Sequence, residues 1–352
     1  MKKFWKYFGR VWLVIGITLI WLVIVLAMSI RLICYGPSES ARNLFVTTML
    51  ETGQMKWVVG LFMPDDEVQA IVNAKSMQVM KQDSDSSLIK VEEGAAQMEA
   101  VEPIVVEKIG GDNFTAHMMI VADPSRVFVG TIYPWPETGT GKVLSEIVET
   151  YGAVAGINGG LYESSGNSGR RPIGPVISKG EIQNMGELGT QGLILIGMSE
   201  DNILQIIDIS GKTEADIRQL IMDNRIRDAV CFQEEATDSN NHFVKLIIGG
   251  ERREMNGMGS GANPRTAIGQ TADGKMLLLV TDGRGANGHL GATASDLIDI
   301  MERYGAVNAA NLDGGSSTSM YYNGEYIQTS VTFYYNNSSW FLPTTFLVSP
   351  MQ

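Results

Sequence analysis

Four short segments combine asparagine, aspartate, arginine and glycine where predicted buried strands begin or end. They are Asn158-Gly-Gly-Leu-Tyr162, Asn263-Pro-Arg-Thr-Ala-Ile-Gly269, Thr281-Asp-Gly-Arg284 and Asn311-Leu-Asp-Gly-Gly-Ser-Ser317. A carboxylate or a guanidinium at the end of a buried strand is costly unless it is paired or serves a function. A structural ion-pair network explains each segment alone, and for the isolated Asp-Gly-Arg it is the better explanation. Four such segments in one domain favour one convergent site.

Taken in order, these segments resemble the motifs of the phosphodiester glycosidase family. The family strings are Asn-Gly-Gly-aromatic, Arg-Thr-Ala-x-Gly, Asp-Gly-Arg and Asn-Leu-Asp-Gly-Gly-Gly-Ser-Ser-Thr-Met. Each string alone is short, whereas the ordered set, spread over about residues 102–352, is specific. Two positions depart from the pattern, because Leu161-Tyr162 stands where two aromatic residues are common and Ser316 replaces the third glycine. Serine fits there as long as the backbone does not need a positive φ.

The resemblance implies an alpha-N-acetylglucosaminidase-like hydrolase that cuts a sugar-1-phosphodiester between the anomeric carbon and oxygen. The leaving group is then a phosphate monoester with a second pKa of about 6, so charge stabilisation matters more than a strong general acid. Arg265 and Arg284 are the candidate phosphate ligands, with Arg171 as a weaker third, because a planar guanidinium binds phosphate oxygens in pairs. Asp313 is the first choice for the carboxylate that attacks or activates water. Asp282 is the second, as partner carboxylate, orienting group or metal ligand.

Other polar residues of these strings suit sugar or anion binding. Asn158 and Asn311 are candidates for the sugar hydroxyls, and the N–H groups from Gly314 to Ser317 for a developing anion. His289 is the histidine nearest the strings and is a candidate proton shuttle, although a histidine in a loop is more often incidental. The residues assigned to substrate binding are Asn158, Gly159, Gly160, Arg171, Thr266, Asn311, Gly314, Gly315, Ser316 and Ser317.

No spacing of His, Cys and Glu in the sequence specifies a transition metal. Clustered aspartates and asparagines are compatible with Ca²⁺ or Mg²⁺, so a divalent cation is an open option and no cofactor is certain. Ser316 and Ser317 invite a serine-nucleophile interpretation, but no Gly-x-Ser-x-Gly elbow surrounds them, and hydrogen bonding is the simpler role.

An internal repeat must position two of the four segments. A predicted helix precedes each of Tyr151-Gly-Ala-Val-Ala-Gly-Ile-Asn158 and Tyr304-Gly-Ala-Val-Asn-Ala-Ala-Asn311, and a glycine pair follows each asparagine closely. The shared unit is a helix, a glycine cap, a short buried strand and a polar residue at a glycine turn. An old duplication with two structural turns explains the likeness. It does not explain why both strand ends remain polar, and a site is therefore favoured slightly.

Hairpin signals and two amphipathic helices define the predicted fold class. Turn pairs at Lys179-Gly180, Asp273-Gly274 and Asn323-Gly324 separate short β runs. The apolar stripes of the two helices lie at Val143–Tyr151 and Leu297–Tyr304, the second after a capping box that begins at Thr293. The prediction is an α+β fold with a mixed β-sheet, flanking helices and the helix-strand-glycine-turn repeat, preceded by one transmembrane helix.

The N-terminus predicts a membrane anchor. Lys2, Lys3, Lys6 and Arg10 precede the apolar run Val11–Ile30, and about 20 helical residues span the roughly 30 Å of a bilayer core. The positive-inside rule places the N-terminus in the cytoplasm and the rest outside. The alternative is a cleaved signal, but a signal core has only about 7–15 apolar residues and ends in small ones.

The predicted division of the chain follows from this anchor. It comprises a cytoplasmic tail (1–10), a transmembrane helix (11–31), a juxtamembrane helical stalk (32–80), a flexible linker (81–101) and a phosphodiester glycosidase domain (102–352). A net charge of −12 argues against a general nucleic-acid surface, and two cysteines give no disulfide framework.

The sequence therefore predicts a single-pass plasma-membrane protein with an extracytoplasmic hydrolase domain. Its expected partners are the membrane and a phosphodiester-linked sugar or polysaccharide of the cell envelope, such as an exopolysaccharide, and not nucleic acid. Two alternatives remain open: a phosphodiesterase that cuts the phosphorus–oxygen bond, and a non-catalytic envelope scaffold or glycan-binding protein.

Overall fold

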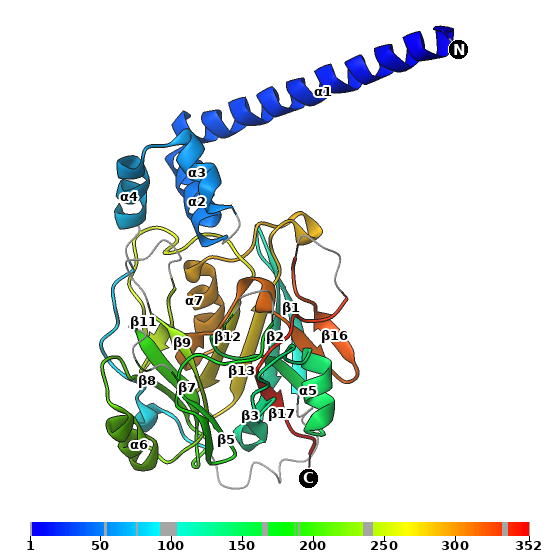
Figure 1. The fold of residues 1–352 in the computed structure, drawn as a ribbon. Coiled ribbons are helices and arrows are strands. Elements are labelled where there is room, and N and C mark those ends of the chain that lie inside the picture. The colour runs from blue at the N-terminus through cyan, green and yellow to red at the C-terminus, as the bar shows by residue number, and fades with distance from the viewer. Residues whose placement is uncertain are drawn as a thin grey trace. The chain divides into compact units, whose positions relative to one another are not determined.

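The computed structural model describes residues 2–52, 55–74, 77–91, 104–163, 168–186, 188, 191–234, 242–332 and 337–351. The chain divides into two compact units, Met1–Ala74 and Lys75–Gln352, and Figure 1 shows the elements of both.

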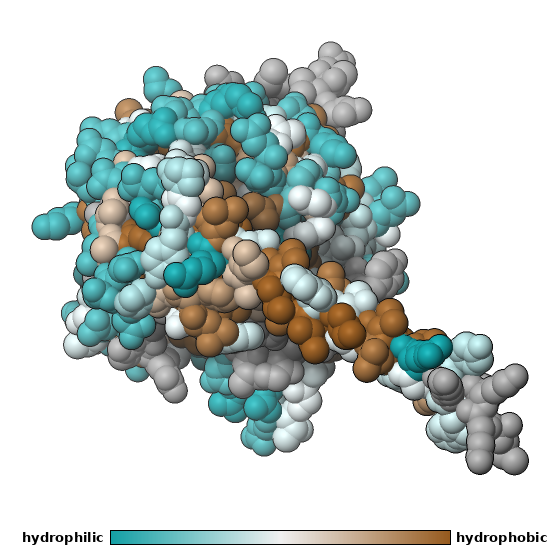
Figure 2. All heavy atoms as spheres, turned by 90° about the horizontal axis from the view of Figure 1, so that it is seen from above, coloured by the Kyte–Doolittle hydropathy of each residue, from teal (hydrophilic) through white to brown (hydrophobic). Residues whose placement is uncertain are grey.

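The first unit consists of helices. They are α1 (Lys2–Tyr35), α2 (Glu39–Glu51), α3 (Lys56–Phe62) and α4 (Asp65–Ala74). Tyr7–Tyr35 has the length and apolar composition of a membrane-spanning helix, which a signal sequence near the N-terminus also has. Its apolar side chains stand out as a brown run in Figure 2. The three short helices share a core with the end of α1, built from Cys34, Val46, Val59, Met63, Val68 and Ile71.

The second unit begins with a segment that was predicted in part as a flexible linker. Ser84 donates from its backbone N–H to the carbonyl of Ile206, and Lys90 donates to Ala272. The ammonium of Lys245, 1% exposed, is bonded to the Gln82 carbonyl. Residues 81–91 are therefore attached to the body, which differs from the prediction, and residues 92–101 lie outside the described residues. The polar residues that suggested a flexible linker thus include hydrogen-bond partners of the buried Lys245.

The strands of the second unit form three sheets, and the described pairings are all antiparallel. The seven-stranded sheet runs, in spatial order, β1 (Ile104–Gly110), β2 (Thr115–Val121), β13 (Met276–Thr281), β12 (Thr266–Thr271), β14 (Ala306–Asn311), β10 (Lys245–Ile248) and β11 (Glu251–Arg252). The β4 sheet runs β16 (Glu325–Gln328), β15 (Met320–Tyr322), β4 (Ala155–Asn158), β17 (Thr344–Val348) and β3 (Val127–Thr131). The β9 sheet runs β6 (Glu181–Asn184), β5 (Val176–Ser178), β9 (Ile226–Gln233), β7 (Leu193–Ser199) and β8 (Leu204–Asp208).

The predicted α+β class is confirmed, with the strands divided among three sheets and not gathered in one mixed sheet. A single core joins them, because apolar side chains of all three sheets pack together, for example Ile157, Val230 and Ile268. Such a shared core fixes the strand ends of different sheets relative to one another.

Each sheet carries one helix. In α7 (Ala294–Arg303), Leu297, Ile298 and Met301 pack on the seven-stranded sheet. In the same way α5 (Leu144–Thr150) covers the β4 sheet, and α6 (Glu214–Asp223) covers the β9 sheet. The α5 and α7 helices and the Thr293 capping box confirm the prediction, whereas the sequence interpretation did not include α6. Short 3-10 turns occur at Ser86–Leu88, Pro124–Arg126, Ala286–Gly288 and Gly315–Ser317.

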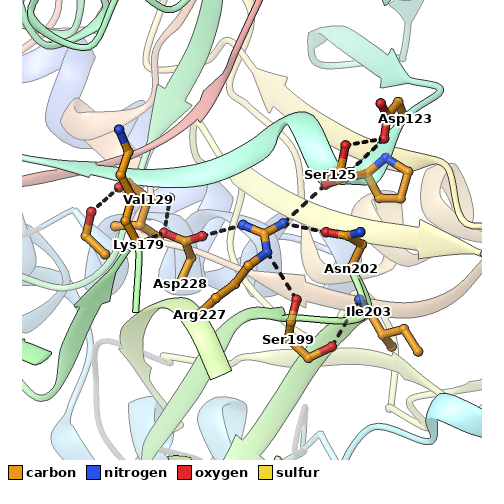
Figure 3. Close-up of polar contacts among 11 residues, drawn as sticks. Asp123, Ser125, Val129, Lys179, Ser199, Asn202, Ile203, Arg227 and Asp228 are labelled. Atoms are coloured by element: carbon orange, nitrogen blue, oxygen red, sulfur yellow. Dashed lines mark hydrogen bonds and ion pairs between the residues drawn. The ribbon is translucent and has the colours of Figure 1, made fainter. Parts of the chain in front are cut away.

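A buried polar cluster joins the β4 and β9 sheets (Figure 3). The carboxylate of Asp228 in β9 is 1% exposed. It accepts hydrogen bonds from the backbone N–H groups of Val129 in β3 at 3.1 Å and of Lys179 at 2.9 Å. Arg227 pairs with the same carboxylate and also donates to Asn202. The charge is therefore fully partnered, and the cluster has a structural role away from the four segments.

Candidate active site

The two repeats end next to each other, although their strands belong to different sheets. Gly152 and Gly305 follow α5 and α7 with φ of 62° and 77°, which confirms the predicted glycine caps. Each cap leads into a buried strand, β4 or β14, whose last residue is an asparagine. The segment that follows β14 carries Asp313, and it is this segment that β4 reaches.

Asn158 makes the connection between the repeats. Its Nδ2 donates to the backbone carbonyl of Asp313 at 2.6 Å. Its Oδ1 accepts from the Thr266 hydroxyl at 2.8 Å and from the Ser319 N–H at 3.2 Å. Asn158 and Thr266 are fully buried, so both position the Asp313 segment. This differs from the sugar-binding role predicted for them.

Asp313 lies partly buried at the centre of the site. Burial raises the pKa of its carboxyl to about 6, against the opposing effects of hydrogen bonds from the Ser317 hydroxyl and the Gly314 N–H and of the positive charge of Arg284. A carboxylate that titrates close to neutrality is typical of a group with a function in acid-base or nucleophilic chemistry.

Tyr162 is a site residue to which the sequence assigned no role. It is 5% exposed, and its hydroxyl lies 2.9 Å from that of Ser317. Burial and the nearby charge of Asp313 raise the pKa of the phenol well above its usual value, so it remains protonated. The signal was present in the sequence as the aromatic position of the Asn-Gly-Gly string, but only the fold reveals its partner.

Arg284 faces the same segment from the loop after β13. Its Nη1 donates to the hydroxyl of Ser316 at 2.7 Å, and its Nε donates to Asn263 at 3.3 Å. The guanidinium is partly buried and its charge acts on Asp313. Gly315 has a φ of 61°, which favours glycine, and a Cβ there would lie 2.7 Å from Nη2. Ser316 has a negative φ, which explains why serine is accepted in place of the third glycine.

Arg265 lies underneath the glycine turn. A Cβ on Gly314 would lie 3.6 Å from the Cα of Arg265 and 3.9 Å from its Cδ. The guanidinium donates to the Gly261 carbonyl at 2.9 Å and to the Ser260 hydroxyl at 3.1 Å, and it stacks on Phe243. Arg265 is only 8% exposed. Its burial and these contacts favour a supporting role over the phosphate contact predicted from the sequence.

Asp282 and His289 form a second pair on the loop that carries Arg284. The Nδ1 of His289 lies 3.0 and 2.9 Å from the two carboxylate oxygens of Asp282. The same carboxylate accepts from the Thr115 N–H at 2.7 Å and from Asn287 at 3.0 Å. Asp282 is 1% exposed, whereas the His289 side chain is 25% exposed. Of the three roles predicted for Asp282, the geometry favours the orienting group.

The remaining predicted residues are structural or peripheral. Asn311 is 2% exposed and donates to the Phe243 carbonyl at 2.9 Å, beneath the site. Gly159 and Gly160 allow close approach, because a Cβ would lie 2.7 Å from Thr344 and 2.4 Å from the Cys231 carbonyl, respectively. The side chain of Arg171 is exposed, and among the described residues no hydrogen bond or ion pair joins this side chain to Asp313.

The donor set does not match a metal site. Among the described residues no group of three or more His, Cys, Asp and Glu is arranged to hold an ion. The oxygens of Asp282 accept from N–H groups, and Asp313 is hydrogen-bonded by Ser317 and Gly314. The residues present therefore do not fit the Ca²⁺ or Mg²⁺ option, and no chemical step is assigned to a metal.

Comparison with known proteins identifies relatives of this arrangement. A sequence model of the phosphodiester glycosidase family matches residues 151–349. N-acetylglucosamine-1-phosphodiester alpha-N-acetylglucosaminidase of Mus musculus is 27% identical over 249 residues, which cover 66% of this chain and 44% of the mouse protein. The Bos taurus protein of the same name is 27% identical over 228 residues, which cover 59% of this chain and 39% of its own. The chain thus spans less than half the length of these curated relatives.

The fold resembles that of a solved structure. That structure is the catalytic domain of the zebrafish protein of that name, auto-inhibited by its pro-peptide. The sequences are 20% identical, the TM-score is 0.52, and the match covers 70% of this chain and 82% of the zebrafish chain.

Proposed function

Since the chain belongs to the phosphodiester glycosidase family, we propose that it hydrolyses sugar-1-phosphodiesters by breaking the bond between the anomeric carbon and the phosphate oxygen. The observation that carries the proposal is a carboxyl whose pKa burial raises to about 6, that of Asp313, near the guanidinium of Arg284, whose charge acts on it and which is bonded to Ser316 of the same segment. One group suits the electron-poor anomeric carbon and the other suits the departing phosphate.

Asp313 acts in its ionised form. Above a pH of about 6 the carboxylate is free to attack the oxocarbenium-like centre or to take a proton from the attacking water. Ser317 donates a hydrogen bond to the carboxylate, and Tyr162, which stays protonated, is placed to donate to Ser317. These two hydroxyls hold the carboxylate in one orientation and supply proton donors at a fixed distance.

Arg284 binds the phosphate as it leaves. The phosphate monoester has a second pKa of about 6, so it departs without full protonation if its growing charge is stabilised. Ser316 holds one end of the guanidinium at 2.7 Å, and Gly315 leaves room for the other.

We assign His289 the role of a proton carrier. Asp282 fixes its Nδ1, which directs Nε2 away from the carboxylate and gives the ring one tautomer when neutral. The ring is partly exposed and therefore exchanges protons with solvent. His289 receives the proton of the attacking water or returns one to the phosphate.

The substrate belongs to the cell envelope, and α1 is the retained membrane anchor. Cys34, in the last turn of α1, is fully buried with Val46 and Val59. The Tyr35 hydroxyl donates to the Phe62 carbonyl at 2.9 Å. Cleavage beyond Tyr35 would remove these parts of a folded core. A retained anchor, with basic residues on the cytoplasmic side, places the hydrolase domain beside extracytoplasmic polymers such as teichoic-acid-like or capsule-like glycans.

The test uses the full chain in nanodiscs with a panel of N-acetylhexosamine-1-phosphodiesters. Release of free sugar is measured for the wild type and for Asp313→Ala and Arg284→Met, with Arg218→Met in α6 as the matched arginine control. The proposal expects turnover in the wild type and the control and losses of about 100-fold or more in the two site variants. Turnover that survives both site substitutions would contradict it.

A further inference from the structure

Helix α3 has an outer face without a single polar side chain. Trp57, Gly60 and Leu61 are exposed on α3, with Trp57 64% and Leu61 68% exposed, and Pro64 is exposed two residues after the helix ends. The opposite face, with Val58 and Val59, is buried against the other helices. Lys56 is the only charged residue of α3. A helix that is apolar both on its buried face and on its exposed face suits contact with lipid.

The neighbouring helices show that this is not a general property of the unit. The exposed positions of α4 include Asp65, Asp66 and Glu67, as expected for a helix in water. Neither α2 nor α4 exposes a large apolar side chain. Within the described part of Met1–Ala74, the exposed large apolar residues lie in α1 and in α3.

Helix α3 is joined to the end of the candidate membrane helix. Phe62, the last residue of α3, accepts a hydrogen bond from Tyr35, the last residue of α1. Cys34 packs on Val59 and Met63 in the core of the unit. Tyr35 itself is 47% exposed and lies where an aromatic residue is expected at the membrane boundary. The end of α1 and the outer face of α3 are thus held together in one folded unit.

We propose that Trp57, Gly60, Leu61 and Pro64 lie in the interfacial layer of the outer leaflet of the membrane that α1 spans. The partner is a phospholipid bilayer, to which the unit is bound by a spanning helix and by a second, shallow contact. Tryptophan and leucine on the same face suit this layer, because the indole tolerates the headgroups and the leucine enters the acyl chains. The inference rests on the retained anchor of the proposed function.

The experiment measures the depth of Trp57 in the full chain, with one protein per nanodisc. The emission of Trp57 is the difference between the wild type and Trp57→Phe, recorded with lipids brominated near the headgroup or near the chain ends, and with acrylamide in the buffer. We expect a blue-shifted emission that shallow bromines quench about twofold, with weaker quenching by deep bromines and by acrylamide.

A second tryptophan separates this inference from the anchor. Trp21 lies in the middle of α1 and is 62% exposed, and its difference emission, from Trp21→Phe, is quenched by deep bromines if α1 spans the bilayer. A Trp21 that bromines do not reach means that the anchor itself is wrong. If Trp21 is quenched while Trp57 responds to acrylamide and not to bromine, the second contact is overturned and the anchor stands.

Two further outcomes decide what covers the face. If Trp57 is shielded from acrylamide and yet is not quenched by bromine, protein covers the face, and the lipid assignment is wrong. Leu61→Asp is expected to remove most of the Trp57 quenching by lipid and to leave that of Trp21 unchanged. Met222→Asp, at a similarly exposed apolar residue of α6 (62%), is the control and should change neither signal.

Discussion

The side-chain amide of Asn158 donates a hydrogen bond of 2.6 Å to the backbone carbonyl of Asp313, 155 residues later in the chain. This contact joins the ends of the two repeats, one in the β4 sheet and one in the seven-stranded sheet. It fixes the backbone of the residue whose carboxyl is central to the site. The internal repeat therefore brings the ends of β4 and β14, each of which ends in an asparagine, close to each other.

Asn158→Ala should destabilise the fold strongly. The substitution removes three hydrogen bonds of a fully buried side chain and leaves Thr266, Ser319 and the Asp313 carbonyl without their partner. We expect a loss of about 2–4 kcal/mol in the free energy of unfolding, measured by denaturant titration. Asn224→Ala removes an exposed hydrogen bond at the end of α6 and should cost less than about 1 kcal/mol. Equal losses would show that Asn158 is not a structural hub.

The pH dependence of hydrolysis should report Asp313. Burial raises the pKa of this carboxyl to about 6, and the mechanism uses the ionised form. We expect kcat/KM to be constant above this pH and to fall tenfold per pH unit well below it. In Arg284→Met the carboxylate loses a neighbouring positive charge, its pKa rises, and the acidic limb moves to higher pH. An acidic limb that stays in place in Arg284→Met would assign the titration to another group.

Asp313→Asn should stabilise the protein in a pH-dependent way. The carboxyl has a pKa of about 6 when folded and about 3.9 when unfolded. A raised carboxyl pKa means that the folded state holds the proton more tightly, so this contribution favours folding below about pH 4 and is lost as the pH rises through about 6. The side chain is partly exposed, and the gain for Asn above pH 7 is therefore on the order of 1 kcal/mol.

Denaturant titrations of the wild type and Asp313→Asn at about pH 4 and about pH 7.5 measure this difference. The two proteins should have similar stability at the lower pH and separate at the higher one. A variant that is less stable at both pH values would show that the ionised carboxylate is a net stabilising group.

Substitution of Arg265 should mainly lower stability, whereas substitution of Arg284 should mainly lower activity. Arg265→Met removes hydrogen bonds to Gly261 and Ser260 beneath the glycine turn, and we expect a loss of about 2–4 kcal/mol in stability. Arg284→Met should change stability by less than about 1 kcal/mol, while kcat/KM falls by about 100-fold or more. Thermal unfolding and initial rates on the same preparations measure both. The reverse pattern would restore Arg265 as the phosphate ligand.

The sequence predicted the parts of the site that depend on local pattern. The ordered strings singled out Asp313, Arg284 and Asn158 as candidate site residues, and the glycine after each helix predicted where the repeats turn. The sequence did not distinguish the roles of Arg265 and Arg284, because the Arg-Thr-Ala string does not show on which side of the glycine turn the guanidinium of Arg265 lies. The role of Tyr162 depends on Ser317, a contact across 155 residues, and no spacing rule gives it.

The fold class was predictable for the same reason, and the sheet count was not. Hairpin turns specify neighbouring strands such as β15 and β16, but the placement of β14 between β12 and β10 depends on packing over the whole core. Residues 81–91 were predicted as part of a flexible linker because they are polar, and composition alone does not show which hydrogen-bond partners polar residues have. Their role becomes visible only with the buried Lys245 in place.

The central claim is that the bond from the anomeric carbon to the phosphate oxygen is the one that breaks. Hydrolysis of an N-acetylhexosamine-1-phosphodiester in ¹⁸O-labelled water, followed by mass spectrometry of both products, tests it directly. We predict the label in the free sugar, with its release lost in Asp313→Ala. Label in the phosphate monoester would mean that the same site cuts the phosphorus–oxygen bond, and it would contradict the assignment of Asp313 to the anomeric carbon.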